Sequence, residues 1–108
     1  MDSEDVLRFL GLAKRAGHLV SGEFMTENAV RSGEAALVVI AGDVSSNTEK
    51  KFKNMCEFYE VPIRKLADKE SLGHSLGKEY RASLAVTDEG MAKTVLEKMQ
   101  RKNANGGF

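Results

Sequence analysis

The chain has 108 residues and a mass of 11.8 kDa, which fits one domain with a single core and leaves no room for a second. Hydrophobic residues make up 42% and charged residues 30%, a balance typical of a soluble folded protein. Sixteen basic residues cancel sixteen acidic ones, so a site for a polyanion has to be local. The single Cys56 excludes an internal disulfide and a cysteine-based zinc site, and favours a reducing, cytoplasmic setting.

The first residues give no sign of export or of a membrane anchor. Residues 2–5 are polar and mostly acidic, whereas a secretory signal begins with basic residues. The longest apolar run, residues 35–41, is far shorter than the roughly 20 residues that span a bilayer. We therefore expect neither a signal peptide nor a membrane partner.

The first third of the chain predicts helix, strand and helix. Ser3 is a plausible N-cap, and Gly17 is a plausible end for the first helix. Its apolar stripe is formed by Val6, Leu7, Leu10 and Ala13. Residues 18–21 predict a short strand, and residues 21–22 precede a second helix that ends at Gly33.

The middle of the chain predicts a buried strand, a helix and an edge strand. Residues 36–41 are continuously apolar and rich in β-branched side chains, as in a strand covered on both faces. Ser46 and Glu49 have the spacing of a capping box, which predicts the start of a third helix. Its expected buried face is formed by Phe52, Met55, Cys56 and Tyr59. Pro62 places the strand within residues 61–66 at the edge of the sheet, because proline lacks the N–H group of a central strand.

The last third predicts a short helix, a strand and a long helix. Asp68 begins the short helix, which ends at Gly77, and residues 82–86 form the strand. Thr87 or Asp88 caps the final helix, whose buried stripe is Ala92, Val95, Leu96 and Met99. The alternation of strands and helices predicts an α/β fold, a three-layer α/β/α sandwich with four strands. One strand can run antiparallel, because the connection at residues 78–81 is short; residues 1–102 form the domain and 103–108 a disordered tail.

No enzyme signature is found in the sequence. Neither the dinucleotide-binding glycine pattern nor the P-loop pattern occurs. Cys56 belongs to an apolar helix face, where a protonated core thiol is expected rather than a nucleophile. His18 and His74 have no metal-ligand spacing, and Asp88 with Glu89 is explained by the dipole of the final helix. We therefore predict no catalysis, no metal and no cofactor.

Three basic clusters are candidates for binding a polyanion. Lys14 with Arg15 ends the first helix, and Lys50, Lys51 and Lys53 lie on the polar face of the third, where solvated cations are ordinary. The third cluster, residues 78–81, differs because it is a loop between a helix-ending glycine and a buried strand. It combines Lys78 and Arg81 with Tyr80, an aromatic that could stack on a base.

Two predicted helix starts offer a second kind of binding group. Residues 21–23 and residues 43–46 each open a helix and present backbone N–H groups that have no helical partner. If both turns lie at one end of the sheet, they form a rim that can accept an anion. Glu23 and Asp43 disfavour simple phosphate capture at this rim, but their carboxylates can accept hydrogen bonds from base amino groups.

Four segments in order resemble a known family. They are residues 10–17 (LGLAKRAG), 20–23 (VSGE), 31–35 (RSGEA) and 72–78 (LGHSLGK). The chain is similar, from about Val6 to Met99, to the kink-turn-binding ribosomal proteins of the L-seven-Ae and L-thirty-e type, and most to the bacterial YlxQ-like branch. Several motifs in the same order make the resemblance specific.

The resemblance implies an α/β/α sandwich with a mixed four-stranded sheet. It also implies a non-enzymatic protein that binds structured, kink-turn-like RNA rather than DNA, in a ribosomal or other ribonucleoprotein setting. The regions that grip RNA in the family correspond here to residues 22–28, 43–45 and 78–81. The candidate RNA-binding residues are Ser21, Gly22, Glu23, Phe24, Met25, Asn28, Asp43, Val44, Lys78, Tyr80 and Arg81.

The chain departs from the kink-turn pattern at the start of the second helix. The family has a glycine, one further residue, an Asn-Glu pair and a Lys three positions later; the matching residues here are Gly22, Phe24, Met25 and Asn28. Phe24 and Met25 either contact a ligand or pack against the core. An alternative function follows from this departure: a protein-interaction adaptor of the same fold that has lost kink-turn binding.

Overall fold

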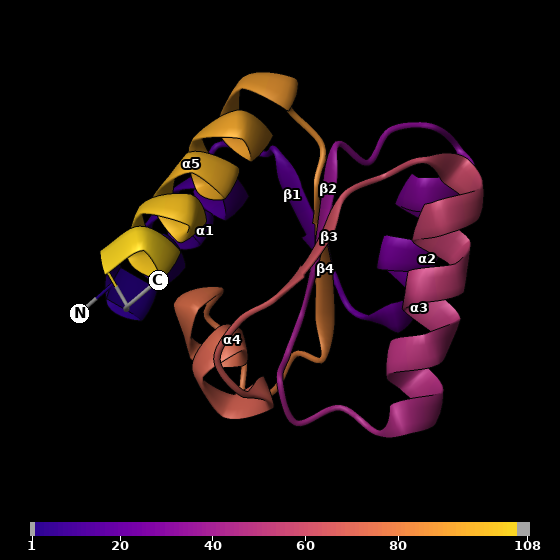
Figure 1. Cartoon of the computed structure of the whole chain (residues 1–108), viewed down its shortest axis with the longest axis horizontal. Helices are drawn as coiled ribbons and strands as arrows, with labels where there is room; N and C mark the ends of the chain where they lie inside the picture. The colour runs from indigo at the N-terminus through magenta and orange to yellow at the C-terminus, as the bar shows by residue number, and fades with distance from the viewer. Residues whose placement is uncertain (1, 106–108) are drawn as a thin grey trace.

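A computed structural model describes residues 2–105 as a single α/β sandwich (Figure 1). Its elements, in chain order, are α1 (Asp2–Arg15), β1 (Leu19–Ser21), α2 (Glu23–Arg31), β2 (Leu37–Ile40), α3 (Ser46–Tyr59), β3 (Ile63–Lys65), α4 (Lys69–Ser75), β4 (Ser83–Val86) and α5 (Glu89–Asn105). None of the helices described has the length and apolar character needed to cross a membrane. The predicted fold class is confirmed.

The four strands form one mixed sheet in the order β1-β4-β2-β3. β4 runs antiparallel to both of its neighbours, with Leu19 and Leu37 on either side of Val86. β3 runs parallel to β2 at the edge, and the carbonyl of Pro62 accepts a hydrogen bond from the N–H of Val38. The prediction of one antiparallel strand and the edge position of Pro62 are both confirmed.

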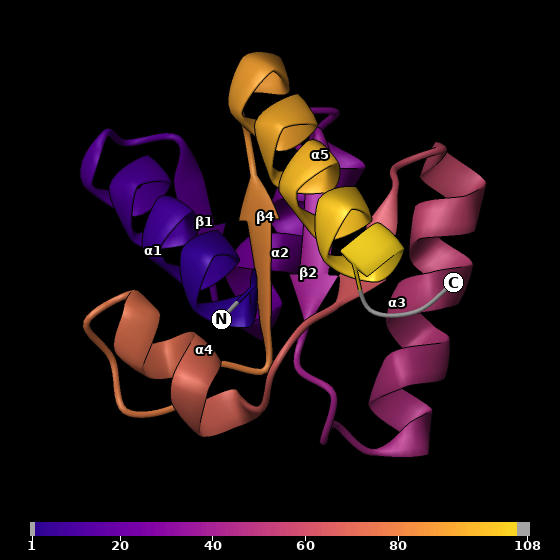
Figure 2. The same cartoon turned by 60° about the vertical axis from the view of Figure 1, so that its left-hand side comes forward.

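Helices cover both faces of the sheet, and each face has its own core (Figures 1 and 2). On one face, α1, α4 and α5 pack on the odd-numbered residues of β2, such as Val39, together with Leu84 and Val86 of β4. On the other face, α2 and α3 pack on Val38 and Ile40. Because neighbouring residues of a strand point to opposite faces, the continuous apolar run of β2 is what a doubly covered strand requires.

The helix ends follow the sequence with two corrections. Gly17 and Gly33 have positive φ angles after α1 and α2, as predicted, but α1 already includes Ser3, which is therefore not its N-cap. The N-cap of α3 is Ser45, whose Oγ accepts from the N–H of Thr48 at 3.1 Å. The predicted capping box of Ser46 and Glu49 is wrong because the chain enters the helix one residue earlier.

The buried face of α3 is shorter than predicted. Phe52 and Cys56 are buried and Met55 is half-buried, but Tyr59 is 40% exposed. Tyr59 is the last residue of α3, and Glu60 after it adopts the left-handed conformation that ends the helix. The ring of Tyr59 packs edge-on against the exposed Phe58 at 4.9 Å instead of against the sheet.

Burial raises the pKa of the Cys56 thiol from its ordinary 9.0 to about 11. We expect the folded protein to react slowly with a thiol-specific reagent at pH 8 and the protein in denaturant to react fast, because only the thiolate attacks. The unfolded thiol loses its proton first, so stability should also fall as the pH rises from about 9 to about 11. Equal labelling rates with and without denaturant would contradict the buried position.

The final helix continues further than predicted. Asp88 caps it, with Oδ2 accepting from the N–H of Met91 at 2.9 Å, and Ala92, Val95 and Met99 are buried as expected. Residues 103–105, which we placed in the tail, lie in α5. Residues 106–108 of that tail lie outside the described part of the chain.

Candidate nucleic-acid interface

Three turns that are far apart in the sequence meet at one end of the sheet. The N–H of Gly22, after β1, donates to the carbonyl of Ser83 at 3.0 Å, and the N–H of Ala41, after β2, donates to the carbonyl of Ala82 at 2.9 Å. The carboxyl ends of β1 and β2 therefore flank the start of the antiparallel β4, at the lower end of the sheet in Figure 1. We call residues 21–28, 43–45 and 78–81 together the rim. Their predicted juxtaposition is confirmed.

The first rim segment exposes apolar side chains at the start of α2. Gly22 precedes α2 with φ 95° and ψ 155°, a conformation that favours glycine, and no side chain caps the helix. Phe24 is 73% exposed and Met25 is 47% exposed, so the alternative that they pack against the core is wrong. Asn28 is also exposed one turn further on.

Glu23 is held by a lysine of the neighbouring helix. Lys51 of α3 donates to Glu23 Oε2 at 2.6 Å and also pairs with Glu27. The two carboxylates raise the pKa of Lys51, which stays charged throughout the physiological range. Lys51, which the sequence placed on a solvated face, thus neutralises Glu23 at the rim and ties α2 to α3.

The second rim segment carries an acidic residue with a structural partner. Asp43 Oδ1 accepts a hydrogen bond from the N–H of Lys69, the first residue of α4, at 2.9 Å. The neighbouring Val44 is half-buried and packs against both cores. Asp43 therefore fixes the turn after β2 to the start of α4, and Val44 anchors the turn to the sandwich.

The third rim segment lies directly on α4. The N–H of Lys78 donates to the carbonyl of Gly73, and the N–H of Arg81 donates to the carbonyl of Lys69, at 2.8 and 3.0 Å. A Cβ atom at Gly73 would lie only 2.7–2.8 Å from the backbone of Tyr80, so the close approach requires glycine. The ring of Tyr80 is left 62% exposed.

Arg81 links the third segment to the first. Its Nε donates to Ser21 Oγ at 2.8 Å and its Nη1 donates to the carbonyl of Tyr80 at 3.0 Å. The guanidinium is therefore oriented by two hydrogen bonds, while Lys78 on the same loop is exposed. Ser21, predicted as a ligand contact, serves here as the acceptor that positions Arg81.

The rim combines three kinds of group that suit RNA. Backbone N–H groups at the start of α2 can donate to phosphate or base oxygens, Lys78 and Arg81 bring positive charge, and Phe24 and Tyr80 offer exposed rings. Within residues 2–105, no group of three or more His, Cys, Asp or Glu side chains could hold a metal ion. Lys51, Lys69 and Gly73 also shape the rim. Sequence reasoning missed Lys51 and Lys69 because their partners, Glu23 and Asp43, are distant in the chain.

Two known RNA-binding proteins are similar to this chain in sequence. The chain is 45% identical over 87 residues to the RNA-binding protein YlxQ of Bacillus subtilis, covering 81% of this chain and 87% of that protein. It is 36% identical over 94 residues to the RNA-binding protein YlxQ of Enterococcus faecium, with 87% and 90% covered.

Two solved structures share the fold. A Bacillus halodurans protein of unknown function superposes with a TM-score of 0.84 at 32% identity, covering 88% of this chain and 96% of that one. The 15.5 kD RNA binding protein of Giardia lamblia superposes with a TM-score of 0.77 at 20% identity, covering 95% and 88%. The family model for the ribosomal protein L7Ae/L30e/S12e/Gadd45 family matches residues 4–96, and the chain belongs to this family.

Proposed function

We propose that this chain is a non-enzymatic protein that binds structured, kink-turn-like RNA through the rim, in a ribosomal or translation-associated complex. The observation that carries the proposal is the meeting of three segments, with free helix-start amides, two cations and two exposed rings, at one end of the sheet. Membership of the family and the RNA-binding names of two relatives support it.

Each rim segment has a distinct task in this proposal. The amides of Glu23 and Phe24 face the RNA from the open end of α2, where the helix dipole favours negative charge. Lys78 and Arg81 pair with phosphates, and the rings of Phe24 and Tyr80 stack on unpaired bases. Because Glu23 pairs with Lys51, its charge repels the backbone less than its position alone implies.

Titration with RNA at several salt concentrations tests the proposal. We expect a kink-turn RNA or a stem with an internal loop to bind more tightly than a plain duplex of equal length. Few cations face the rim, so two to four counterions should be released, giving a slope of log K against log salt of about −2 to −4. Equal affinity for all three RNAs at low salt would contradict the proposal.

Replacing both cations of the third segment should weaken RNA binding by about tenfold or more, because two phosphate contacts are lost. The variant is Lys78→Ala/Arg81→Ala, and its salt slope should be shallower by about 1 to 2. The matched control is Arg64→Ala/Lys93→Ala, which removes the same charge from the exposed edge strand β3 and from the start of α5. If the control loses as much RNA affinity as the rim variant, the affinity depends on the net charge of the protein and not on the position of the cations, which would contradict binding at the rim.

A second candidate function is protein binding by the same rim. The observation that favours it is the exposure of the apolar Phe24 and Met25, which replace the polar Asn-Glu pair of the kink-turn pattern. An adaptor should keep its cellular protein partner in Lys78→Ala/Arg81→Ala and lose it in Phe24→Ala/Met25→Ala. RNA that crosslinks to the wild type and is released by the first variant supports RNA binding instead.

A further inference from the structure

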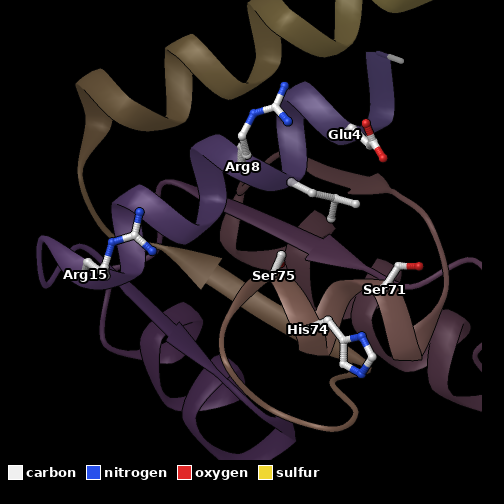
Figure 3. Close-up of a pocket in the computed structure, with 7 residues that line it drawn as sticks. Glu4, Arg8, Arg15, Ser71, His74 and Ser75 are labelled. Carbon is white, nitrogen blue, oxygen red and sulfur yellow. The ribbon is translucent and has the colours of Figure 1, made fainter.

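A hollow lies outside the rim, between α1 and α4 (Figure 3). Its volume is about 420 Å³, and its lining residues are Glu4, Leu7, Arg8, Arg15, Ser71, His74 and Ser75. The two helices approach each other closely, because a Cβ atom at Gly11 would lie 2.7 Å from the carbonyl oxygen of Ser75. We call this hollow the α1–α4 groove.

Positive charge dominates the groove. Arg8 and Arg15 are seven residues apart, so they lie on the same side of α1, about 10 Å apart along its axis. Both are exposed, and neither belongs to an ion pair among the residues described, whereas Lys51, Lys53, Lys65 and Lys98 each pair with a carboxylate. The exposed imidazole of His74 adds a third nitrogen-bearing side chain. Glu4 is the single acidic side chain of the lining.

The short helix α4 lies between the groove and the third segment of the rim. His74 and Ser75 follow Gly73, whose carbonyl accepts from Lys78 and whose Cα lies against the backbone of Tyr80. Figure 3 shows Ser71, Ser75 and His74 on α4 with Arg8 and Arg15 on α1 beside it. One helix of seven residues, α4, therefore separates Lys78 at the rim from the groove lined by His74 and Ser75.

We infer that the α1–α4 groove binds the phosphodiester backbone of single-stranded RNA that flanks the structured element held at the rim. This inference rests on the proposed function of the rim. A hollow of about 420 Å³ has the size of a small-ligand pocket, which is enough to hold a few backbone groups of one strand. An arginine that has no ion-pair partner can donate bidentate hydrogen bonds to a phosphate group, and the groove is lined by two such arginines.

Two RNA molecules separate the groove from the rim. The first is a kink-turn stem alone, and the second is the same stem with six unpaired nucleotides added at each end. We expect the extension to raise affinity about tenfold at low salt in the wild type. Arg8→Ala/Arg15→Ala should abolish this gain, reduce the salt slope for the extended RNA by about 1.4, and leave binding of the stem unchanged. Arg64→Ala/Lys93→Ala should leave the gain intact.

A change of opposite sign strengthens the test. Glu4→Gln removes the negative charge of the lining, so we expect it to increase the gain from the extension about twofold to threefold. Lys78→Ala/Arg81→Ala should lower the affinity for both RNAs by the same factor. The inference about the groove is overturned if the extension adds no affinity, or if it adds as much affinity in Arg8→Ala/Arg15→Ala as in the wild type. Neither result would contradict RNA binding at the rim. A wild type that binds neither RNA better than duplex overturns the proposed function instead.

Discussion

Gly73→Ala is expected to lower the free energy of unfolding by about 1–3 kcal/mol and to weaken RNA binding at the rim. The added Cβ would lie 2.7–2.8 Å from three backbone atoms of Tyr80, which cannot move aside as a flexible side chain can. Alanine favours a helix by about 1 kcal/mol over glycine, so a net loss would mean that the clash exceeds this gain. The loop that carries Lys78 and Arg81 has to shift, and affinity should fall about tenfold with the displaced charge contacts.

Thermal unfolding and RNA titration measure the two effects of Gly73→Ala. Glu70→Ala on the exposed side of the same helix is the control, with a change within about 0.5 kcal/mol. Binding is compared at a temperature where circular dichroism shows each variant folded. A Gly73→Ala protein that is as stable as the wild type and binds RNA equally well would refute the close contact.

Phe52→Ala is expected to cost about 3–5 kcal/mol of stability, a larger loss than that of Gly73→Ala. Phe52 is 1% exposed and is the largest fully buried side chain among the residues described, where it joins α3 to Val38, Ile40 and Ala85 of the sheet. The loss includes both the favourable free energy of burying the ring, which the variant lacks, and the cost of the cavity left behind. Since small domains are stable by only about 5–15 kcal/mol, this change removes a large share of the total.

Phe58→Ala on the same helix is the matched control for Phe52→Ala. Its ring is 78% exposed and touches only the edge of Tyr59 among the aromatic contacts described, so we expect a loss below about 1 kcal/mol. Denaturant unfolding measures both variants. Similar losses for Phe52→Ala and Phe58→Ala would contradict the inward orientation of this face of α3.

The layers of the fold could be predicted from the sequence because they depend on local patterns. The β-branched run at residues 36–41 predicted a doubly covered strand, and Gly17 and Gly33 marked two helix ends correctly. The predictions for Ser46 and Tyr59 were wrong because both residues lie at helix ends, where a shift of one residue changes which side chain caps the helix or is buried. Ser45 competes with Ser46 for the same cap, and the turn at Glu60 directs Tyr59 to solvent.

The site was predictable in its position and less so in its internal contacts. Helix-start patterns predicted a rim from residues 21–23 and 43–46 if both turns lie at one end of the sheet, and the family resemblance added residues 78–81 to it. The partners of its charged residues were not predictable, because they come from other elements: Lys51 binds Glu23, and the amide of Lys69 binds Asp43. The α1–α4 groove was missed for the same reason, since it exists only where two helices from distant parts of the chain cross.

The central claim is that the rim binds RNA. NMR spectra of the backbone amides of the 15N-labelled protein, recorded during titration with a kink-turn RNA, test it most directly. We predict that the amide signals of Gly22, Val44 and Tyr80 shift or broaden first, while those of Gly33 and Thr87, at the other end of the sheet, stay in place. Perturbations centred on Gly33 and Thr87, or an unchanged spectrum at saturating RNA, would contradict binding at the rim.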